Sequence, residues 1–153
     1  RLALPSSLRL LGQLVTDLAA SLTAMGQQPP TPGGFLSPDA AALLEEERML
    51  VLLAGHLLAD STVGEAAAIP DIVLAGCQPG GEAPELLINL VSALFFILSM
   101  ELSFVEADPS DPRRSPLVGE TFLSFGTRWA GSYLEPDSNM YRRGTLDACP
   151  ALL

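Results

Sequence analysis

An uncharged segment in the middle of the chain constrains the fold most strongly. Residues 86–100 (LLINLVSALFFILSM) contain no Asp, Glu, Lys or Arg, and Glu85 and Glu101 flank them. Apolar side chains in this segment fall on every side of a helix, which predicts a helix buried among several neighbours. A membrane-spanning helix needs about 20 predominantly apolar residues. Because the segment is shorter and includes one Asn and two Ser, we expect a core helix and no membrane insertion.

Four long helical patterns follow one another along the chain. Apolar residues recur at steps of three and four over residues 7–25, 37–59, 84–106 and 115–134, with one short helical turn at 70–76. Pro and Gly predict loops at about 26–36, 76–84 and 107–115, and 137–153 is interpreted as a connector or a frayed end. No segment alternates apolar and polar residues as a half-buried strand does. The sequence therefore predicts an all-α fold of antiparallel helical hairpins.

Two of these helices begin with the same dipeptide. Ser37-Pro38 and Ser115-Pro116 each place a capping hydroxyl before the residue preferred at the first helical position. Ser7 is expected to cap the first helix in the same way. The charged run at 45–48 (EEER) is interpreted as a solvated turn of the second helix, since consecutive side chains point about 100° apart and do not converge on a metal ion.

Charge and composition exclude several classes of protein. Of 153 residues, 48% are hydrophobic and 17% charged, which is unlike a disordered tail. The chain has 18 acidic and 8 basic residues and a net charge of −10, so it lacks the basic surface that nucleic-acid binding needs. Cys77 and Cys149 are not part of a CxxC or Cys/His cluster, so no zinc site is predicted. Their pairing in a disulfide is conceivable but not expected, because nothing marks the chain as secreted.

Residues that carry catalysis or bind cofactors are not indicated. His56 is the only histidine, and Asp60 lies one helical turn later. A structural hydrogen bond that ties the helix end to the next loop is favoured over an acid–base pair or half a metal site. The sequence has no GxxxxGK[ST] phosphate loop and no GxSxG motif. Trp129 and Tyr133, four residues apart, are interpreted as core packing. We therefore expect no enzyme activity, no metal and no cofactor.

Two stretches nevertheless resemble a known family. They are AGHLLADSTVGEAAAIP at residues 54–70, and SPLVG at 115–119 followed by RWAGSYL at 128–134. Both resemble segments of the exportin-4 and exportin-7 group of the importin-beta (karyopherin) superfamily, and exportin-4 is the closer match. The matched positions are Gly55, His56, Leu58, Ala59, Asp60, Gly64, Glu65, Ile69 and Pro70 in the first stretch, and Arg128, Trp129, Tyr133 and Leu134 in the second. Ala66 to Ala68 and Ser132 depart from the family pattern.

The resemblance implies a fold, a function and partners. It implies HEAT-repeat hairpins stacked in an α-solenoid superhelix, with residues 1–153 a partial HEAT-repeat segment of a larger chain. It implies a nuclear transport receptor that carries protein cargo through the nuclear pore, binds Ran-GTP, contacts Phe-Gly repeats of pore proteins and shuttles between nucleus and cytoplasm. The matched residues are interpreted as structural, and no contact residue is carried over. The alternative is a HEAT-type scaffold or adaptor with no Ran cycle.

Overall fold

The protein is all-helical throughout the part of the chain that the computed structural model describes. These residues are 4–28, 35–60, 67–77, 80–107, 111 and 113–134, without the side chains at 104, 105 and 107. Their helices are α1 (Leu4–Gly26), α2 (Pro38–Leu58), α3 (Asp71–Gly76), α4 (Ala83–Ala107) and α5 (Pro116–Trp129), and α5 continues into a π-helical turn, η1 (Ala130–Leu134). No strand occurs within these ranges, and the all-α prediction is confirmed.

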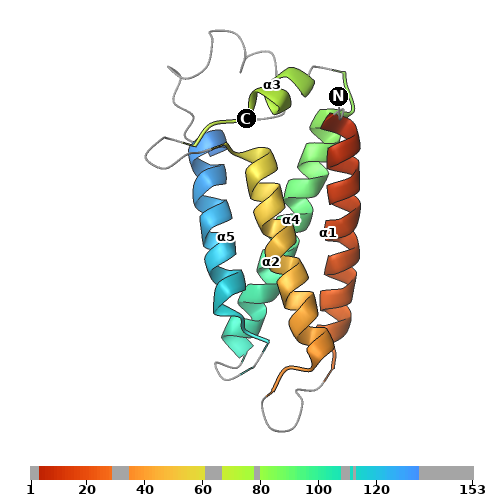
Figure 1. Ribbon diagram of the computed structural model, residues 1–153, viewed down its shortest axis with the longest axis vertical. Coiled ribbons are helices and arrows are strands. Elements are labelled where there is room, and N and C mark those ends of the chain that lie inside the picture. Colours follow the sequence, from red (N-terminus) through yellow and green to blue (C-terminus); the bar gives the residue numbers. More distant parts are fainter. Residues whose placement is uncertain are drawn as a thin grey trace.

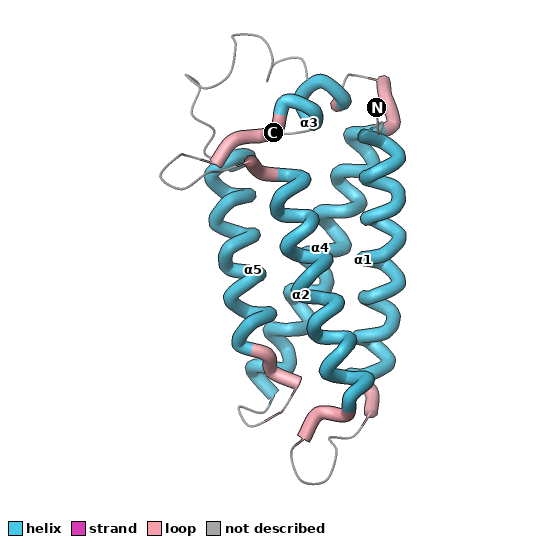
Figure 2. The backbone as a smooth tube through the Cα atoms, in the orientation of Figure 1, coloured by secondary structure: helices cyan, strands magenta, loops and turns pink. Residues whose placement is uncertain are grey.

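The four long helices form two layers, α1 with α2 and α4 with α5 (Figure 1). Helix α1 packs against α4, and α2 packs against α5. The helices of each such pair run in the same direction, whereas α1 and α2, which also pack together, run in opposite directions. Helix α3 lies across one end, where α1 and α4 begin and where α2 and α5 end (Figures 1 and 2). Sequential long helices are therefore antiparallel, as predicted.

Helix starts follow the capping signals in two cases and depart from them in one. The Ser37 hydroxyl accepts a 3.1 Å hydrogen bond from the backbone N–H of Ala40, and the Ser115 hydroxyl accepts one from Val118. Ser7 does not cap α1, because that helix begins at Leu4. Pro5 lies in the first helical turn, where the missing N–H of proline costs no hydrogen bond, so the helix extends one turn further than the pattern predicted.

The core consists of apolar stripes on the long helices. On α1 the stripe contains Leu4, Leu8, Leu11, Val15, Leu18, Leu22 and Met25. On α4 it contains Leu87, Leu90, Leu94 and Ile97, at steps of three and four residues. The two stripes bury each other in the interface between α1 and α4, which is the most extensive helix pairing of the described chain. Burial of apolar surface on this scale is the main force that holds these helices together.

Helix α4 is buried on one face only, and the expectation of a fully buried helix was wrong. Phe96 is 52% exposed and Leu102 is 53% exposed, and Ile88 and Phe95 are also partly open to solvent. The uncharged segment thus covers α1 with one face and leaves the other uncovered among the described residues. By length and mean hydropathy (2.0 over Ala83–Ser103), this helix would also be able to cross a membrane.

After α2, a backbone bridge pairs Asp60 with Ala68. The N–H of Asp60 donates to the carbonyl of Ala68 at 2.8 Å, and the N–H of Ala68 donates back to Asp60 at 2.9 Å. Helix α3 follows directly from Pro70, close to the predicted range of 70–76. Cys77 at its end is buried, and Cys149 lies outside the described residues, so their pairing stays a prediction.

Candidate functional site

The two stretches that carry the family resemblance meet at one end of α2 and α5. The phenolic hydroxyl of Tyr133 donates a 2.7 Å hydrogen bond to the backbone carbonyl of Leu58, in the last turn of α2. Both residues are buried. The last carbonyls of a helix have no partner within the helix, so Tyr133 satisfies one of them from the turn that follows α5. This contact joins positions 75 residues apart in the sequence.

Aromatic rings continue from this contact towards α4. The ring of Trp129 stacks on Tyr133 at a centroid distance of 6.0 Å, and the ring of Phe95 meets Trp129 edge-on at 5.3 Å. Aromatic pairs in these geometries stabilise a core beyond the area that they bury. Trp129 is packed against the hydrophobic core. Trp129 and Tyr133 thus pack as predicted, and they join α5 to both α2 and α4.

His56 lies opposite Arg128 and not beside Asp60. The Nδ1 atom of His56 is 3.2 Å from Nη1 of Arg128, so one residue of each matched stretch takes part in this contact as well. No hydrogen bond joins His56 to Asp60 among the described residues. The helix end is tied to the next loop through the backbone of Asp60, which pairs with Ala68. The side chain of Asp60 is exposed.

The other matched residues are divided between core and surface. Ala59 and Ile69 are buried, Pro70 precedes α3, and Leu134 is exposed. Gly55 is buried, and a Cβ atom there would lie 3.7 Å from the ring of Phe125, an ordinary contact distance. Gly55 therefore lies at the α2–α5 interface, but the space does not demand a glycine. Gly64 and Glu65 lie outside the described residues.

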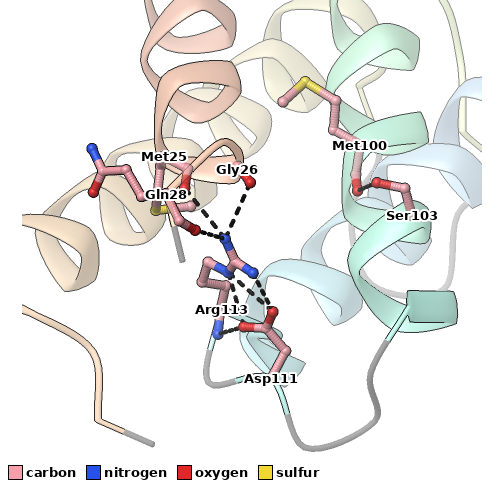
Figure 3. Close-up of polar contacts among 7 residues, drawn as sticks. All are labelled: Met25, Gly26, Gln28, Met100, Ser103, Asp111 and Arg113. Carbon is pink, nitrogen blue, oxygen red and sulfur yellow. Dashed lines mark hydrogen bonds and ion pairs between the residues drawn. The ribbon is translucent and has the colours of Figure 1, made fainter. Parts of the chain in front are cut away.

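Arg113, which no sequence motif marks, contacts the C-terminal end of α1 (Figure 3). Nη1 of Arg113 lies 3.3 Å from the carbonyl oxygen of Met25, 3.4 Å from that of Gly26 and 3.2 Å from that of Gln28. Nε of Arg113 donates to the carboxylate of Asp111 at 2.9 Å. The guanidinium lowers the pKa of Asp111 by hydrogen bonding. A cation stabilises the negative end of a helix dipole, and α1 has no basic residue of its own in its last turn.

Two acidic side chains are buried between the layers. Glu47 on α2 is 0% exposed and Glu101 on α4 is 7% exposed. Both oxygens of Glu47 and Oε1 of Glu101 have no hydrogen-bond partner among the described residues. Burial raises the pKa of Glu47 to about 8, and the nearby Glu101 contributes to that rise. Burial also raises the pKa of Glu101 to about 7. The two carboxyl groups therefore retain protons at a pH where exposed glutamates are ionised.

The burial of Glu47 corrects the interpretation of residues 45–48 as a solvated turn. Glu45 and Arg48 do form an exposed ion pair, with 2.6 Å between Nη2 and Oε1. Glu47, however, lies at a three-residue step from Leu44 and a four-residue step from Val51, within the buried stripe of α2. Glu101 continues the α4 stripe in the same way, four residues after Ile97. The spacing of Glu47 from Leu44 and Val51 already indicated that it is buried. The charged residues beside it led instead to the prediction of a solvated turn.

Glu101 lines a groove between α4 and α5. The groove has a volume of about 890 Å³ and is bounded by Leu98 and Leu102 of α4, by Phe122 and Leu123 of α5, and by the loop before α5. Its walls are mainly apolar. Within the described ranges, no three His, Cys, Asp or Glu side chains converge as a metal site would need. The chemistry available here is binding by apolar surface around a buried carboxyl group.

No protein-family model matches the chain, and no solved structure matches it.

Proposed function

We propose that this chain is a segment of an exportin-like nuclear transport receptor that carries protein cargo through the nuclear pore with Ran-GTP. The observation that carries the proposal is the junction between α2 and α5. The residues that resemble the family occur in two stretches, and the pairs Leu58–Tyr133 and His56–Arg128 link them in space. These contacts support the resemblance, because they place matched residues of both stretches in one structural unit.

The arrangement of helices supports the HEAT-type part of this proposal. In a stack of helical hairpins, each hairpin contacts its neighbour through equivalent helices. Here the first helix of one hairpin (α1) packs on the first of the next (α4), and the second helices (α2 and α5) pack likewise. The equivalent helices run in the same direction, as stacking of repeats requires. We therefore propose that α1–α2 and α4–α5 are two adjacent HEAT-type hairpins of a solenoid.

The uncovered face of the second hairpin also agrees with a continuing stack. Phe96 and Leu102 on α4 and Leu123 on α5 are all more than half exposed. Each repeat of a solenoid buries its apolar faces against the repeats on both sides. A further hairpin packed on this face would remove these side chains from water.

Nucleotide-dependent binding of Ran to the complete gene product tests the function. Ran loaded with a non-hydrolysable GTP analogue and Ran loaded with GDP are each titrated against the purified protein by biolayer interferometry. We expect binding of the GTP form and at least about tenfold weaker binding of the GDP form, a difference in the range usual for conformational switches. A fluorescent fusion is expected in both nucleus and cytoplasm.

The alternative is the scaffold or adaptor without a Ran cycle, which makes the opposite prediction. Such a protein binds its partners regardless of the nucleotide on Ran and does not bind Ran-GTP. Absence of Ran binding, or equal binding of both forms, would overturn the transport proposal. The packing of α1 on α4 and of α2 on α5 would be unaffected by that result.

A further inference from the structure

Two serine–proline pairs begin long helices of this chain. Ser37 precedes Pro38 at the start of α2, and Ser115 precedes Pro116 at the start of α5. A residue before proline is restricted to an extended conformation, and Ser115 is extended, with φ −101° and ψ 112°, and partly exposed. Proline-directed protein kinases act on a serine that is extended and directly followed by proline. Both serines therefore have the local form of a kinase substrate.

Ser115 differs from Ser37 in the cleft that lies beside it. A cleft of about 320 Å³ separates the first half of α2 from the start of α5, and Ser115, Arg114 and Arg48 line it. Ser37 is exposed and is not one of the residues that line this cleft. Arginine side chains thus approach the surroundings of Ser115 from two separate elements, α2 and the loop before α5.

The charges that line the cleft favour an anion. Glu45 also lines it and pairs with Arg48, with 2.6 Å between Oε1 and Nη2. Such a surface pair is worth little, so a phosphate with nearly two negative charges competes with Glu45 for this guanidinium. Arg114 has a partner of its own, and its charge adds to the positive potential. Arg113 is held by Asp111 and by carbonyl oxygens at the end of α1.

We propose that Ser115 is a phosphorylation site, and that the phosphate on this residue binds Arg48 and Arg114 across the cleft. A proline-directed kinase transfers the γ-phosphoryl group of ATP to Oγ of Ser115. The bond between the γ-phosphorus and its bridging oxygen breaks, a P–Oγ bond forms, and ADP and the hydroxyl proton leave. Guanidinium groups then donate charge-assisted hydrogen bonds to the phosphate oxygens.

The phosphate changes how α2 and α5 are joined. Their polar contacts described above, Leu58–Tyr133 and His56–Arg128, lie at the end of α2. A phosphate on Ser115 adds a link near the beginning of both helices, so phosphorylation strengthens the α2–α5 interface at its opposite end. The site therefore regulates the stability of this interface. This inference does not depend on the proposed transport function.

The first experiment tests Ser115 as a substrate. The folded 153-residue chain is incubated with ATP and a proline-directed serine/threonine kinase, and tandem mass spectrometry locates the phosphate. We expect phosphate on Ser115. Ser115→Asn keeps a capping side chain and removes the acceptor, so it is expected to fold and to incorporate less phosphate. Phosphate on Ser37 alone would overturn the proposal, as would its absence from both serines while a Ser-Pro peptide is phosphorylated under the same conditions.

The second experiment tests the arginine cleft separately from the helix start. Phosphoserine is introduced in place of Ser115 or of Ser37 through an expanded genetic code, and both positions cap a helix. Phosphorus NMR then follows the second ionisation of each phosphate, whose pKa is ordinarily about 6. We expect the phosphate pKa at Ser115 to be lower by about 0.5 or more than at Ser37, because nearby arginines favour the dianion. The Tm is expected to rise by about 2–4 °C with phosphate on Ser115.

Two arginine variants of the chain phosphorylated on Ser115 locate the contact. Arg48→Gln removes a cleft guanidinium and is expected to raise the phosphate pKa towards its value at Ser37. Arg9→Gln removes the same charge from an exposed pair with Glu82 on the other layer contact, and is expected to leave the phosphate pKa unchanged. Equal phosphate pKa values at the two serines would overturn the proposal. An equal response to both arginine variants would also overturn it, because the effect would then be one of net charge.

Discussion

Tyr133 closes the last turn of α2 from outside that helix, through a buried 2.7 Å hydrogen bond from its hydroxyl to the carbonyl oxygen of Leu58. The π-helical turn Ala130–Leu134 holds the tyrosine in place after α5. Because Trp129 stacks on the same ring, the Tyr133 side chain connects α2 to the aromatic rings of the core. Its loss is therefore expected to affect the junction as a whole.

Tyr133→Phe tests this contact directly. The variant keeps the ring and leaves the Leu58 carbonyl buried without a donor, which costs about 1–3 kcal/mol of unfolding free energy. Urea denaturation of the wild type and the variant measures the loss. Ser99→Ala is the matched control, since its exposed hydroxyl donates to Phe96 within α4, and we expect it to change stability by less than about 0.5 kcal/mol. Equal effects of the two substitutions would contradict a special role for Tyr133.

Arg113→Ala is expected to destabilise the C-terminal end of α1. It removes the cation that contacts three carbonyl oxygens there and leaves the buried Asp111 without its partner. We expect a loss of about 1–3 kcal/mol, together with faster amide hydrogen exchange in the last turn of α1. Arg48→Ala breaks the exposed pair with Glu45 and is expected to cost less than about 1 kcal/mol. Unchanged exchange at Met25 in the Arg113 variant would argue against the cap.

Stability is expected to fall as pH rises, because of Glu47 and Glu101. Their pKa values in the folded protein are about 8 and about 7, against 4.5 for an ordinary glutamate. Between pH 4.5 and 8 the unfolded chain releases these protons while the folded chain retains them, so the free energy of unfolding decreases with pH. One pKa unit corresponds to about 1.4 kcal/mol, and the total loss therefore amounts to several kcal/mol.

Glu47→Gln makes that pH profile flatter, since an amide does not ionise. Urea denaturation at pH 5, 7 and 9 compares the variant with the wild type. Glu46→Gln changes the exposed neighbour and serves as the control, with a profile parallel to that of the wild type. If the Glu47 and Glu46 variants both run parallel to the wild type, Glu47 is not the group that titrates.

The uncovered face of α4 predicts self-association of the 153-residue chain. Phe96 and Leu102 are exposed there, and contiguous apolar surface of this kind promotes contact between proteins. Sedimentation velocity over a range of concentrations is expected to show association in the wild type and less of it in Phe96→Asp. Leu10→Asp, on the exposed side of α1, is the control and is expected to associate like the wild type. A monomer at every concentration would contradict this prediction.

Helix type and approximate position could be predicted from the sequence because they depend on local signals. Ser37-Pro38 and Ser115-Pro116 marked two helix starts correctly. Ser7 did not mark a start, because a helix continues N-terminally wherever the preceding residues tolerate it, and Pro5 does so in a first turn.

The candidate site was less accessible to prediction, because its contacts link distant positions. Arg113 reaches carbonyls 85 to 88 residues earlier, and nothing in the sequence around it indicates that target. The same holds for Arg128 and His56, whose contact links positions 72 residues apart. Glu47 differs from these, because its step from Leu44 and to Val51 was visible in the sequence and was outweighed by its charged neighbours.

Helix α1 packs against α4, which is synthesised later, and this determines when α1 becomes covered during synthesis. Gly26, the end of α1, and Ala107, the end of α4, are separated by 81 residues. At about 5–20 residues per second, a ribosome takes roughly 4–16 s to cover that distance. For this interval the leucine stripe of α1 has no α4 to cover it. While only the α1–α2 hairpin has been made, its apolar side chains are exposed. The nascent chain therefore needs protection by chaperones during this interval.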